Sequence, residues 1–390
     1  MKSESELKAG SSRLDGLTSF RAWLGAVAFP FWAERGQLRP GVFVERLDAE
    51  GRPDTGTSRR VRMQARQTFS FATAAVKGWA DTADIALAGG HHLLTVCSDP
   101  DRPGKFFRRV EPDGRVSEAG SDLYEQACAI LAFSALYQLT GDTPWRDAAF
   151  AAVEYVETAL GHPAGGYREG DPDRLPRRQN PHMHMMESYL ALYDACGAPG
   201  ALDGAARMSE LFRDRFFDAR AGLLLEYFDD DLRPLEAKDG GRVEPGHEME
   251  WVWLLRAWAE RGGCVEDGAI TALFRHALDA GLNPRSGLLY NVVDRDNAVI
   301  GPQARLWPQT ERVKAEFAQA RAGIHDAAAA ITELERVHGT FLTEAAEGHW
   351  YDLVDAEGHR VPGPVPASAL YHLTTMMLEI ERFIVEQDKG

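Results

Sequence analysis

The sequence RQNPHMHMME at residues 178–187 is typical of the first turns of a helix that follows a tight turn. Asn180, His184 and Glu187 are spaced i, i+4, i+7 and are expected to share one helical face. His182 falls about 200° away from Asn180 on the helical wheel. The stretch therefore predicts a helix that aims a histidine and a carboxylate in one direction.

A second stretch, EPGHEMEW at residues 244–251, has the same character. His247, Glu250 and Trp251 are spaced i, i+3, i+4 and are again expected to share a face. Two similar polar groups at helix starts, about 63 residues apart, indicate one site built from repeated units.

The repeat extends along the whole chain. Six times, a glycine is followed by an apolar or aromatic run and then an acidic turn, a pattern that predicts a short β-hairpin or a strand with its turn. The intervals between the glycines are 63, 61, 57, 65 and 61 residues. The repeats begin at Gly41, Gly104, Gly165, Gly222, Gly287 and Gly348.

The segments between these glycines predict pairs of helices. The expected ranges are 60–79, 82–97, 121–140, 143–160, 182–196, 199–217, 246–262, 266–281, 306–322 and 325–339, with 14–36 opening the chain and 365–387 closing it. About twelve helices favour a closed ring of six inner and six outer helices, because an open solenoid needs polar capping repeats. The prediction is an all-α fold, an α6/α6 barrel with short hairpins at one rim, formed by a single domain over residues 1–390.

In such a ring the inner helices all begin near the same rim, so their early polar residues converge. The convergent set comprises Arg66, Gln126, His184, His247, Glu250, Glu311 and His372. A single histidine of this kind is more often structural, but three in different repeats favour a functional cluster. Trp307, four residues before Glu311, and Trp251 are usual core residues that also suit stacking on a sugar ring.

Arg66 lies in an inner helix and allows two interpretations. It forms an ion pair with Glu250 or Glu311, or it donates hydrogen bonds to sugar hydroxyls or to a developing enolate oxygen.

A catalytic metal is not expected. His182 and His184 are two residues apart on a helix and diverge, so they do not ligate one ion together. His247 with Glu250 is spaced like one half of a di-iron site, which needs two such pairs. No cofactor motif is present either, because the sequence has no phosphate-binding glycine loop, no GxSxG and no GxGxxG after a strand.

The composition limits the partners. A net charge of −16 argues against nucleic acid or an anionic membrane, although it leaves room for a local basic pocket and a phosphorylated substrate. Four scattered cysteines, the lack of a signal-peptide pattern and the lack of a long apolar run predict a soluble protein of the cytoplasm. We expect a monomer or a homodimer.

Several stretches resemble the N-acylglucosamine 2-epimerase superfamily, and within it the aldose–ketose isomerases of mannose isomerase and sulfoquinovose isomerase type. They are RMQARQTFSFA at 63–73, QNPHMHMMESYLALYD at 179–194, EPGHEMEWVWLL at 244–255, RLWPQTERVKA at 305–315, WYDLVDAEG at 350–358 and ASALYHL at 367–373. The resemblance covers nearly the whole chain and implies the same α6/α6 barrel.

By this resemblance, His247 and His372 are the pair that transfers protons at C1 and C2 of the sugar. Arg66 holds or polarises the oxygens of the open chain, and His184 and Glu250 position the substrate or open its ring. Asn180, Trp307 and Glu311 line the pocket, to which we add Glu187, Trp251 and Gln126 as candidates. The chain departs from many relatives at Gln126, where they have histidine, and at Arg62, where some have an aromatic residue.

The sequence thus predicts a metal-independent aldose–ketose isomerase, with mannose and fructose as the expected pair. A neutral histidine can remove the proton alpha to a carbonyl and return it one carbon away through an enediolate. Two histidines on opposite faces of C2 would instead give a 2-epimerase for an N-acyl hexosamine or cellobiose. A glycoside hydrolase using Glu250 and Glu311 is a more distant alternative, and a sugar-binding protein without turnover is the last.

Overall fold

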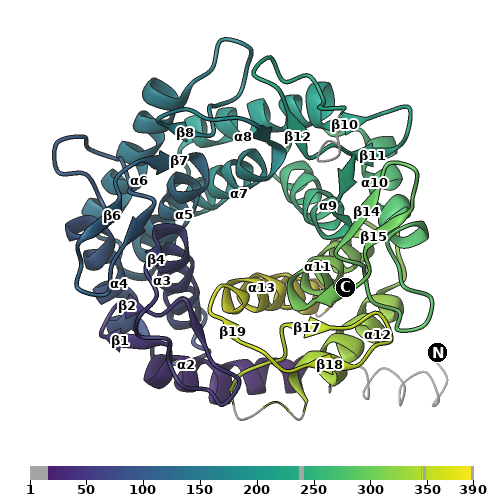
Figure 1. The fold of residues 1–390 in the computed structure, drawn as a ribbon, viewed down its shortest axis with the longest axis horizontal. Helices are drawn as coiled ribbons and strands as arrows, with labels where there is room; N and C mark the ends of the chain where they lie inside the picture. Colours follow the sequence, from purple (N-terminus) through teal and green to yellow (C-terminus); the bar gives the residue numbers. More distant parts are fainter. Residues whose placement is uncertain (1–15, 237–240, 344, 346–347, 388–390) are drawn as a thin grey trace.

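The chain was analysed as a computed structural model that describes residues 16–236, 241–343, 345 and 348–387. It is mostly helical, with short strands, and its helices form two layers around a central axis (Figure 1). The inner layer consists of α3 (Val61–Val76), α5 (Leu123–Thr140), α7 (Gln179–Cys196), α9 (Pro245–Glu260), α11 (Leu306–Arg321) and α13 (Ala369–Gln387). Successive inner helices contact one another, and α13 also contacts α3, so the inner layer closes on itself.

From α4 onward, each outer helix packs on the inner helix that precedes it. The outer layer consists of residues 16–35 with α2 (Phe29–Arg35), then α4 (Ala83–Thr95), α6 (Thr143–Tyr155), α8 (Pro199–Leu211), α10 (Asp267–Asp279) and α12 (Ala327–Val337). A turn of π-helix lies at Leu24–Ala28, and others extend α6, α8 and α12 at Val156–Leu160, Phe212–Phe216 and His338–Leu342.

The short strands join neighbouring repeats, which the sequence did not predict. Each strand that precedes an inner helix pairs antiparallel with a strand of another repeat. These pairs are β4 (Arg59–Arg60) with β5 (Arg109–Val110), β7 (Ser121–Asp122) with β8 (Gly170–Asp171), β9 (Arg177–Arg178) with β12 (Tyr227–Phe228), β13 (Arg242–Val243) with β14 (Val292–Asp294), β16 (Ala304–Arg305) with β17 (Leu353–Val354), and β19 (Val365–Pro366) with β3 (Arg46–Leu47).

Hairpins within a repeat are also present, as expected. They are β1 (Gln37–Arg39) with β2 (Val42–Phe43), β5 with β6 (Val116–Glu118), β10 (Phe217–Asp218) with β11 (Leu223–Leu224), β14 with β15 (Val299–Gly301), and β17 with β18 (Arg360–Val361). All six repeat glycines have positive φ, between 72° and 96°, a conformation that costs glycine little. At Gly104 a Cβ would lie 2.0 Å from the Ala151 carbonyl oxygen, so the turn also packs too closely on α6 for a side chain.

The two ends of the described chain meet and close the ring. Arg21, in the opening helix, forms an ion pair of 3.2 Å with Glu381 in α13, which confirms the expected pairing of the first and last helices. Trp32 stacks on Trp350 with 4.9 Å between ring centroids, and its Nε1 donates to the Gly348 carbonyl at 3.1 Å. No helix in the described ranges is both long and apolar enough to cross a bilayer.

With the π turns that extend α6, α8 and α12 included, the expected helix ranges agree with the structure to within three residues at both ends, except that α13 begins at Ala369 rather than 365 because Val365 and Pro366 belong to β19. Differences of three residues occur at the start of α7, which begins at Gln179 rather than 182, and at the end of α3, which is Val76 rather than 79. Pro366 supplies no backbone N–H for a helix, and the pairing of β19 with β3 keeps this segment extended. Residues 14–15 of the expected opening helix lie outside the described residues.

Arg59 and Arg177 occupy equivalent places, one residue before the end of β4 and β9, but their surroundings differ. Arg177 donates to the carbonyls of Gly165, Tyr167 and Asp230. Arg59 is 1% exposed, and none of its guanidinium nitrogens has a hydrogen-bond partner among the described residues. The carbonyl of Phe43, which corresponds to that of Tyr167, accepts a hydrogen bond from Gln64 instead.

Replacing Arg59 with methionine is therefore expected to raise the free energy of unfolding by about 1–3 kcal/mol, because a buried donor without a partner is removed. The matched change Arg177→Met should lower it, because three carbonyls then lose their donor. Urea unfolding followed by circular dichroism measures both. A loss of stability in the Arg59 variant would mean that this guanidinium is solvated or bonded in solution.

Candidate active site

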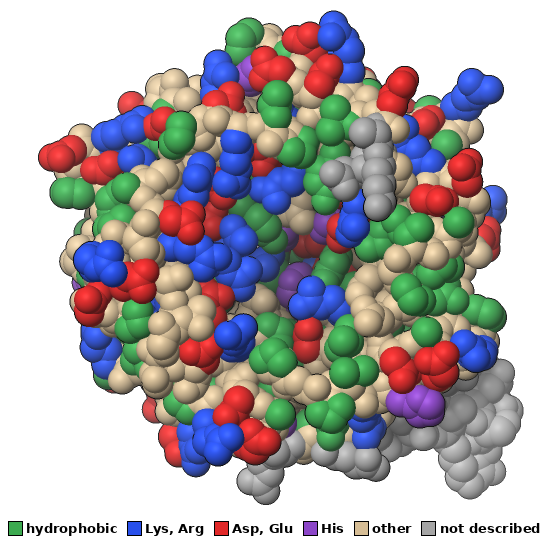
Figure 2. Space-filling model, viewed as in Figure 1, with side chains coloured by type: hydrophobic (Ala, Val, Ile, Leu, Met, Phe, Trp, Pro, Cys, Tyr) green, Lys and Arg blue, Asp and Glu red, His purple; other side chains and the backbone are tan. Residues whose placement is uncertain are grey.

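A cavity of about 330 Å³ opens at the rim where the inner helices begin. Figure 2 looks into it and shows Lys and Arg side chains gathered around a central hollow with histidine at its floor. Seven of the residues expected from the sequence line it: Arg66, Asn180, His184, His247, Glu250, Trp307 and His372. The convergence of inner-helix residues is thus observed for these seven.

Equivalent positions of the inner helices face the axis in layers. We count from the residue before each inner helix, and for α13, which two residues separate from β19, from Pro366 at the end of that strand. The residue six positions after this starting point faces the cavity layer in each inner helix. In chain order these residues are Arg66, Cys128, His184, Glu250, Glu311 and His372. The residues nine positions after the starting point form a deeper layer. They are Phe69, Leu131, Glu187, Trp253, Lys314 and Thr375.

This register corrects the expectation for Gln126. The residue equivalent to His184 is Cys128, and Gln126 lies two positions earlier, about 200° away around the helix. Its side-chain amide bonds the backbone N–H and carbonyl of Phe106 at 3.1 and 3.0 Å, away from the cavity. Gln126 therefore anchors its own hairpin to α5. His182 has the equivalent place in α7 and accepts from the Tyr167 N–H at 3.0 Å.

His184 is surrounded by defined partners on both ring nitrogens. Nδ1 lies 3.0 Å from Glu187 Oε2, and Nε2 lies 2.8 Å from the Tyr124 hydroxyl and 3.2 Å from Arg66 Nη2. A guanidinium can only donate, so Nε2 is the acceptor and Nδ1 carries the proton. Burial lowers the pKa of His184 to about 4, which keeps the imidazole neutral at physiological pH.

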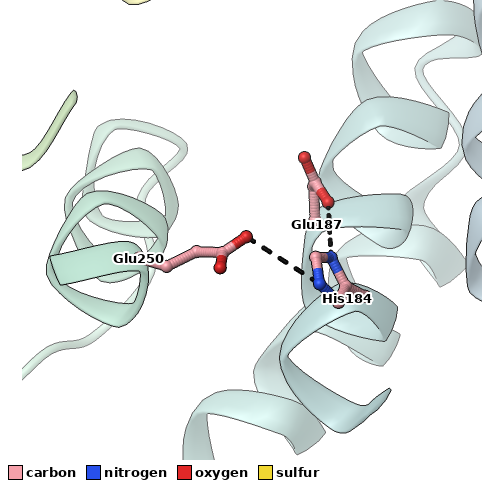
Figure 3. A group of neighbouring side chains, drawn as sticks. All are labelled: His184, Glu187 and Glu250. Atoms are coloured by element: carbon pink, nitrogen blue, oxygen red, sulfur yellow. Dashed lines mark hydrogen bonds and ion pairs between the residues drawn. The ribbon is translucent and has the colours of Figure 1, made fainter. Parts of the chain in front are cut away.

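His184, Glu187 and Glu250 lie close enough together to raise the question of a metal. Figure 3 shows Glu187 beside Nδ1 of the imidazole and Glu250, from α9, beside Nε2 at 3.9 Å. A histidine ligates an ion through one nitrogen, whereas these two carboxylates face different nitrogens of the ring. Glu187 also accepts from the Tyr371 hydroxyl. The donor set as arranged does not converge on one point and does not fit a metal ion.

His247 has the opposite electrostatic setting. Its Nδ1 lies 3.0 Å from Glu226 Oε1 and 3.7 Å from Glu244 Oε2. Burial lowers the pKa of His247, but these carboxylates outweigh burial and raise it to about 10. His247 is therefore an imidazolium at neutral pH. Asn180 Nδ2 lies 2.7 Å from His247 Nε2, and because a protonated Nε2 can only donate, the imidazolium requires this amide to turn so that its Oδ1, which has no partner in the described part of the chain, accepts.

The repeat explains why the Glu226 carboxylate bonds a histidine, His247, rather than an arginine. An acidic residue stands four positions after the repeat glycine in several repeats, and Glu45 and Glu169 there pair with Arg60 and Arg178, the residues that precede α3 and α7. Before α9 the corresponding residue is Glu244. Glu226 thus has no arginine at this place and bonds His247 instead.

Among the described residues, the His372 ring is hydrogen-bonded to Glu311. Its Nδ1 lies 2.7 Å from Glu311 Oε1, which leaves Nε2 toward the cavity that His372 lines. Burial lowers the pKa of His372 well below its usual value, and Arg66 and Lys314 act in the same direction. His372 is therefore a neutral imidazole whose free Nε2 can take a proton.

Glu250 is 1% exposed, and its Oε1 has no hydrogen-bond partner in the described part of the chain. Burial raises the pKa of Glu250, and the nearby carboxylate of Glu311 raises it further. A protonated carboxyl here can donate to a substrate hydroxyl.

Trp307 lies between the protonated His247 and the neutral His372. Its ring centroid is 5.1 Å from that of His247 and 5.8 Å from that of His372. Gly246 makes this possible, because a Cβ there would lie 2.7 Å from the Trp307 ring. The glycine of the EPGH sequence therefore lets an apolar platform approach α9.

Three further residues expected at the site do not line the cavity. Trp251 is rotated by about 100° from Glu250; it packs on Phe212 and donates to Gln179 Oε1 at 2.7 Å, so its expected place on the face of His247 was wrong. Glu187 and Glu311 lie one step behind His184 and His372 and bond their Nδ1 atoms. A second cavity of about 230 Å³, at the other end of the inner helices, reaches Glu187 from behind.

Sequence reasoning missed nine cavity residues: Arg60, Tyr124, Arg178, Glu226, Tyr227, Glu244, Arg305, Pro366 and Ser368. Several immediately precede inner helices, so the paired arginines at 59–60 and 177–178 were the available signal. Arg60, Arg178 and Arg305 each bond a carboxylate, of Glu45, Glu169 and Asp352, through Nε and Nη2. Each guanidinium keeps its Nη1 for another acceptor.

Residues 41–376 match the family described as N-acylglucosamine 2-epimerase (GlcNAc 2-epimerase). A protein of Rhizobium meliloti (strain 1021) named mannose-6-phosphate isomerase is 36% identical over 378 residues, covering 92% of this chain and 95% of the relative. Among solved structures, cellobiose 2-epimerase from Spirochaeta thermophila DSM 6192 superposes with a TM-score of 0.83 at 22% identity, covering 96% and 98% of the two chains. A structure titled D-mannose isomerase gives 0.78 at 20% identity, covering 97% and 98%.

Proposed function

The chain belongs to the N-acylglucosamine 2-epimerase family and is a sugar isomerase or epimerase, and from this premise we propose that it is an aldose–ketose isomerase that interconverts D-mannose and D-fructose. We also infer that its two helix layers form an α6/α6 barrel of one domain. The observation that carries the isomerase proposal is the different surroundings of the two histidines beside Trp307. His247 Nδ1 lies against the carboxylates of Glu226 and Glu244, whereas His372 Nδ1 meets Glu311 and leaves Nε2 toward the cavity.

His372 acts as the base in this mechanism. Its free Nε2 removes the proton from C2 of the open-chain aldose, and the same imidazolium returns it to C1 on the same face of the enediolate. His247 acts as the acid, because its Nε2–H donates to the carbonyl oxygen at C1 as negative charge develops there. His247 transfers this proton to O1, and the O2 proton passes to the now neutral His247 as the new carbonyl forms at C2, which restores the imidazolium.

A 2-epimerase needs a second base on the opposite face of C2. His247 is held as a cation by Glu226 and Glu244, so it suits donation to oxygen better than removal of a proton from carbon. This asymmetry favours the isomerase over the epimerase. Arg66, His184 and Glu250 surround the remaining side of the cavity and are proposed to open the ring and hold its hydroxyls.

The test is NMR of the purified protein, treated with a chelator, with mannose in D₂O. The expected result is fructose that carries deuterium at C1, and unchanged activity after chelation. Glucose with deuterium at C2 would assign the protein as a 2-epimerase. Release of a phenol from aryl glycosides without either product would favour a hydrolase.

The arginines at the rim favour a hexose phosphate as a second candidate substrate. Arg60, Arg178 and Arg305 line the cavity before alternate inner helices, and a sugar with C1 and C2 at the histidines extends its other end toward this rim. Guanidinium groups bind phosphate through several N–H donors, and each of these keeps Nη1 for that purpose. The curated relative named mannose-6-phosphate isomerase supports the same possibility.

For this candidate, kcat/KM is expected to be at least about tenfold higher for mannose 6-phosphate than for mannose, since one charge-assisted contact contributes about 1.5–3 kcal/mol. Arg178→Gln should remove most of that preference and leave the rate with mannose within about twofold. Steady-state assays with both sugars at two salt concentrations measure it. Equal kcat/KM for the two sugars would restrict the proposal to the free hexose.

A further inference from the structure

Lys314 is buried in the layer below the cavity floor. Its side chain is 0% exposed, whereas of the other described lysines Lys77 is exposed and Lys105 is 8% exposed. Fully buried lysines are rare unless they are paired. Lys314 Nζ lies 2.5 Å from Glu311 Oε2, 3.3 Å from Thr375 Oγ1 and 3.7 Å from the centroid of the Trp253 ring.

Lys314, Glu311 and His372 thus contact one another in series, from the layer below the cavity to the cavity itself. Lys314 meets one oxygen of the Glu311 carboxylate, and His372 Nδ1 lies 2.7 Å from the other. The Glu311 carboxylate can face the Lys314 ammonium and accept from His372 Nδ1 at the same time only while it is ionised. An ionised Glu311 can only accept, so the proton of the neutral His372 is on Nδ1. The tautomer decides whether Nε2 is a base or a donor.

We propose that Lys314 is a positioning residue: its ammonium keeps Glu311 anionic, so that Glu311 accepts the Nδ1 proton of His372 and Nε2 remains the base that faces the sugar. The inference rests on the proposed isomerase function for its catalytic consequence, but the tautomer itself is independent of the substrate.

The surrounding charges agree with this role. Burial raises the pKa of Glu311, and Lys314 opposes that rise. Burial lowers the pKa of His372, and the Arg66 and Lys314 cations lower it further. The charged or titratable groups that face the Glu311–His372 pair are Arg66 on α3, His184 and Glu187 on α7, His247 and Glu250 on α9, Lys314 on α11 and Tyr371 on α13.

The test is Lys314→Met, which keeps the length of the side chain and removes its charge. Without the ammonium, the Glu311–His372 pair binds a proton more tightly, and the pair must lose that proton for Nε2 to act. The acidic limb of the kcat profile is therefore expected to move to higher pH, with kcat at pH 7 reduced about 10–100-fold and KM changed little. The matched control is Lys105→Met, which breaks a lysine–carboxylate pair of 2.9 Å with Asp99 far from the cavity and should leave the profile unchanged.

A double variant shows whether Lys314 acts through Glu311. If it does, Lys314→Met together with Glu311→Gln is no slower than Glu311→Gln alone. The proposal would be overturned if the losses in kcat of the two single variants multiplied in the double variant. It would also be overturned if the acidic limb did not move in Lys314→Met.

A measurement without substrate separates this inference from the function. ¹⁵N NMR of histidine-labelled protein is expected to show His372 protonated on Nδ1 and bare on Nε2 at pH 7, and to show a loss of that state in Lys314→Met. If the protein shows this tautomer and its loss in Lys314→Met but does not isomerise hexoses, the proposed function is refuted and the role of Lys314 in setting the tautomer stands. An Nε2-protonated His372 in the unsubstituted protein would overturn the role itself.

Discussion

Replacing His372 with asparagine is expected to lower kcat by about 10²–10⁴-fold, the usual contribution of a positioned base. Asparagine retains a polar group that can face Glu311 but has no nitrogen lone pair of suitable basicity. His247→Asn should cause a loss in the same range, because the donor to the developing enediolate disappears. Turnover is measured with whichever hexose the wild-type protein converts.

The matched control is His92→Asn. His92 is 7% exposed, as His372 is, but lies on the outer helix α4. It should keep wild-type kcat, and circular dichroism should show that all three variants are folded. A His372 variant within tenfold of the wild-type rate would remove this residue from the acid–base assignment.

The second large effect is expected in the pH dependence. His247 must be protonated to donate, and its pKa is about 10 because the carboxylates of Glu226 and Glu244 outweigh the effect of burial. Activity should therefore persist through pH 9 and fall as pH rises through about 10. In Glu226→Gln the pKa of His247 drops toward or below its ordinary value. The variant should then lose about 10–100-fold relative to the wild type at pH 9, and less at pH 6.

The stability of the folded protein should also depend on the protonation of His247. The pKa of His247 is higher in the folded chain than the usual 6.5, so its ion pair stabilises the fold fully below pH 6.5. This contribution is lost as pH rises from 6.5 through about 10, and thermal unfolding across that window should show the loss. Glu248→Gln is the control, because Glu248 pairs with His276 at 2.9 Å on the other side of α9. An unchanged alkaline limb in Glu226→Gln would contradict the imidazolium assignment.

The sequence by itself determined the repeat, and with it most of the fold. The glycines at 41, 104, 165, 222, 287 and 348 occupy left-handed turns in the structure, and the apolar periodicity between them gives the helix pairs. These features depend on local backbone conformation and on which face of a helix is apolar, both of which are written in consecutive residues. The same reasoning brought His184, His247 and His372 to one cavity.

Only the tertiary structure decided the register and the charges. Gln126 and Trp251 are one or two residues from positions that face the axis, and on a helix one residue is a rotation of about 100°. That offset is set by where the preceding strand pairs with the next repeat, which involves residues some 50 positions away, such as Arg59 with Val110.

The protonation states are likewise set by contacts across the ring. His247 and His372 are the same residue type, yet one lies against Glu226 and Glu244 while the other is approached by Arg66 and Lys314. A side-chain pKa depends on burial and on charges within a few ångströms, and these come from different helices. The sequence supplied the histidines, and contacts across the ring raise the pKa of His247 and lower that of His372.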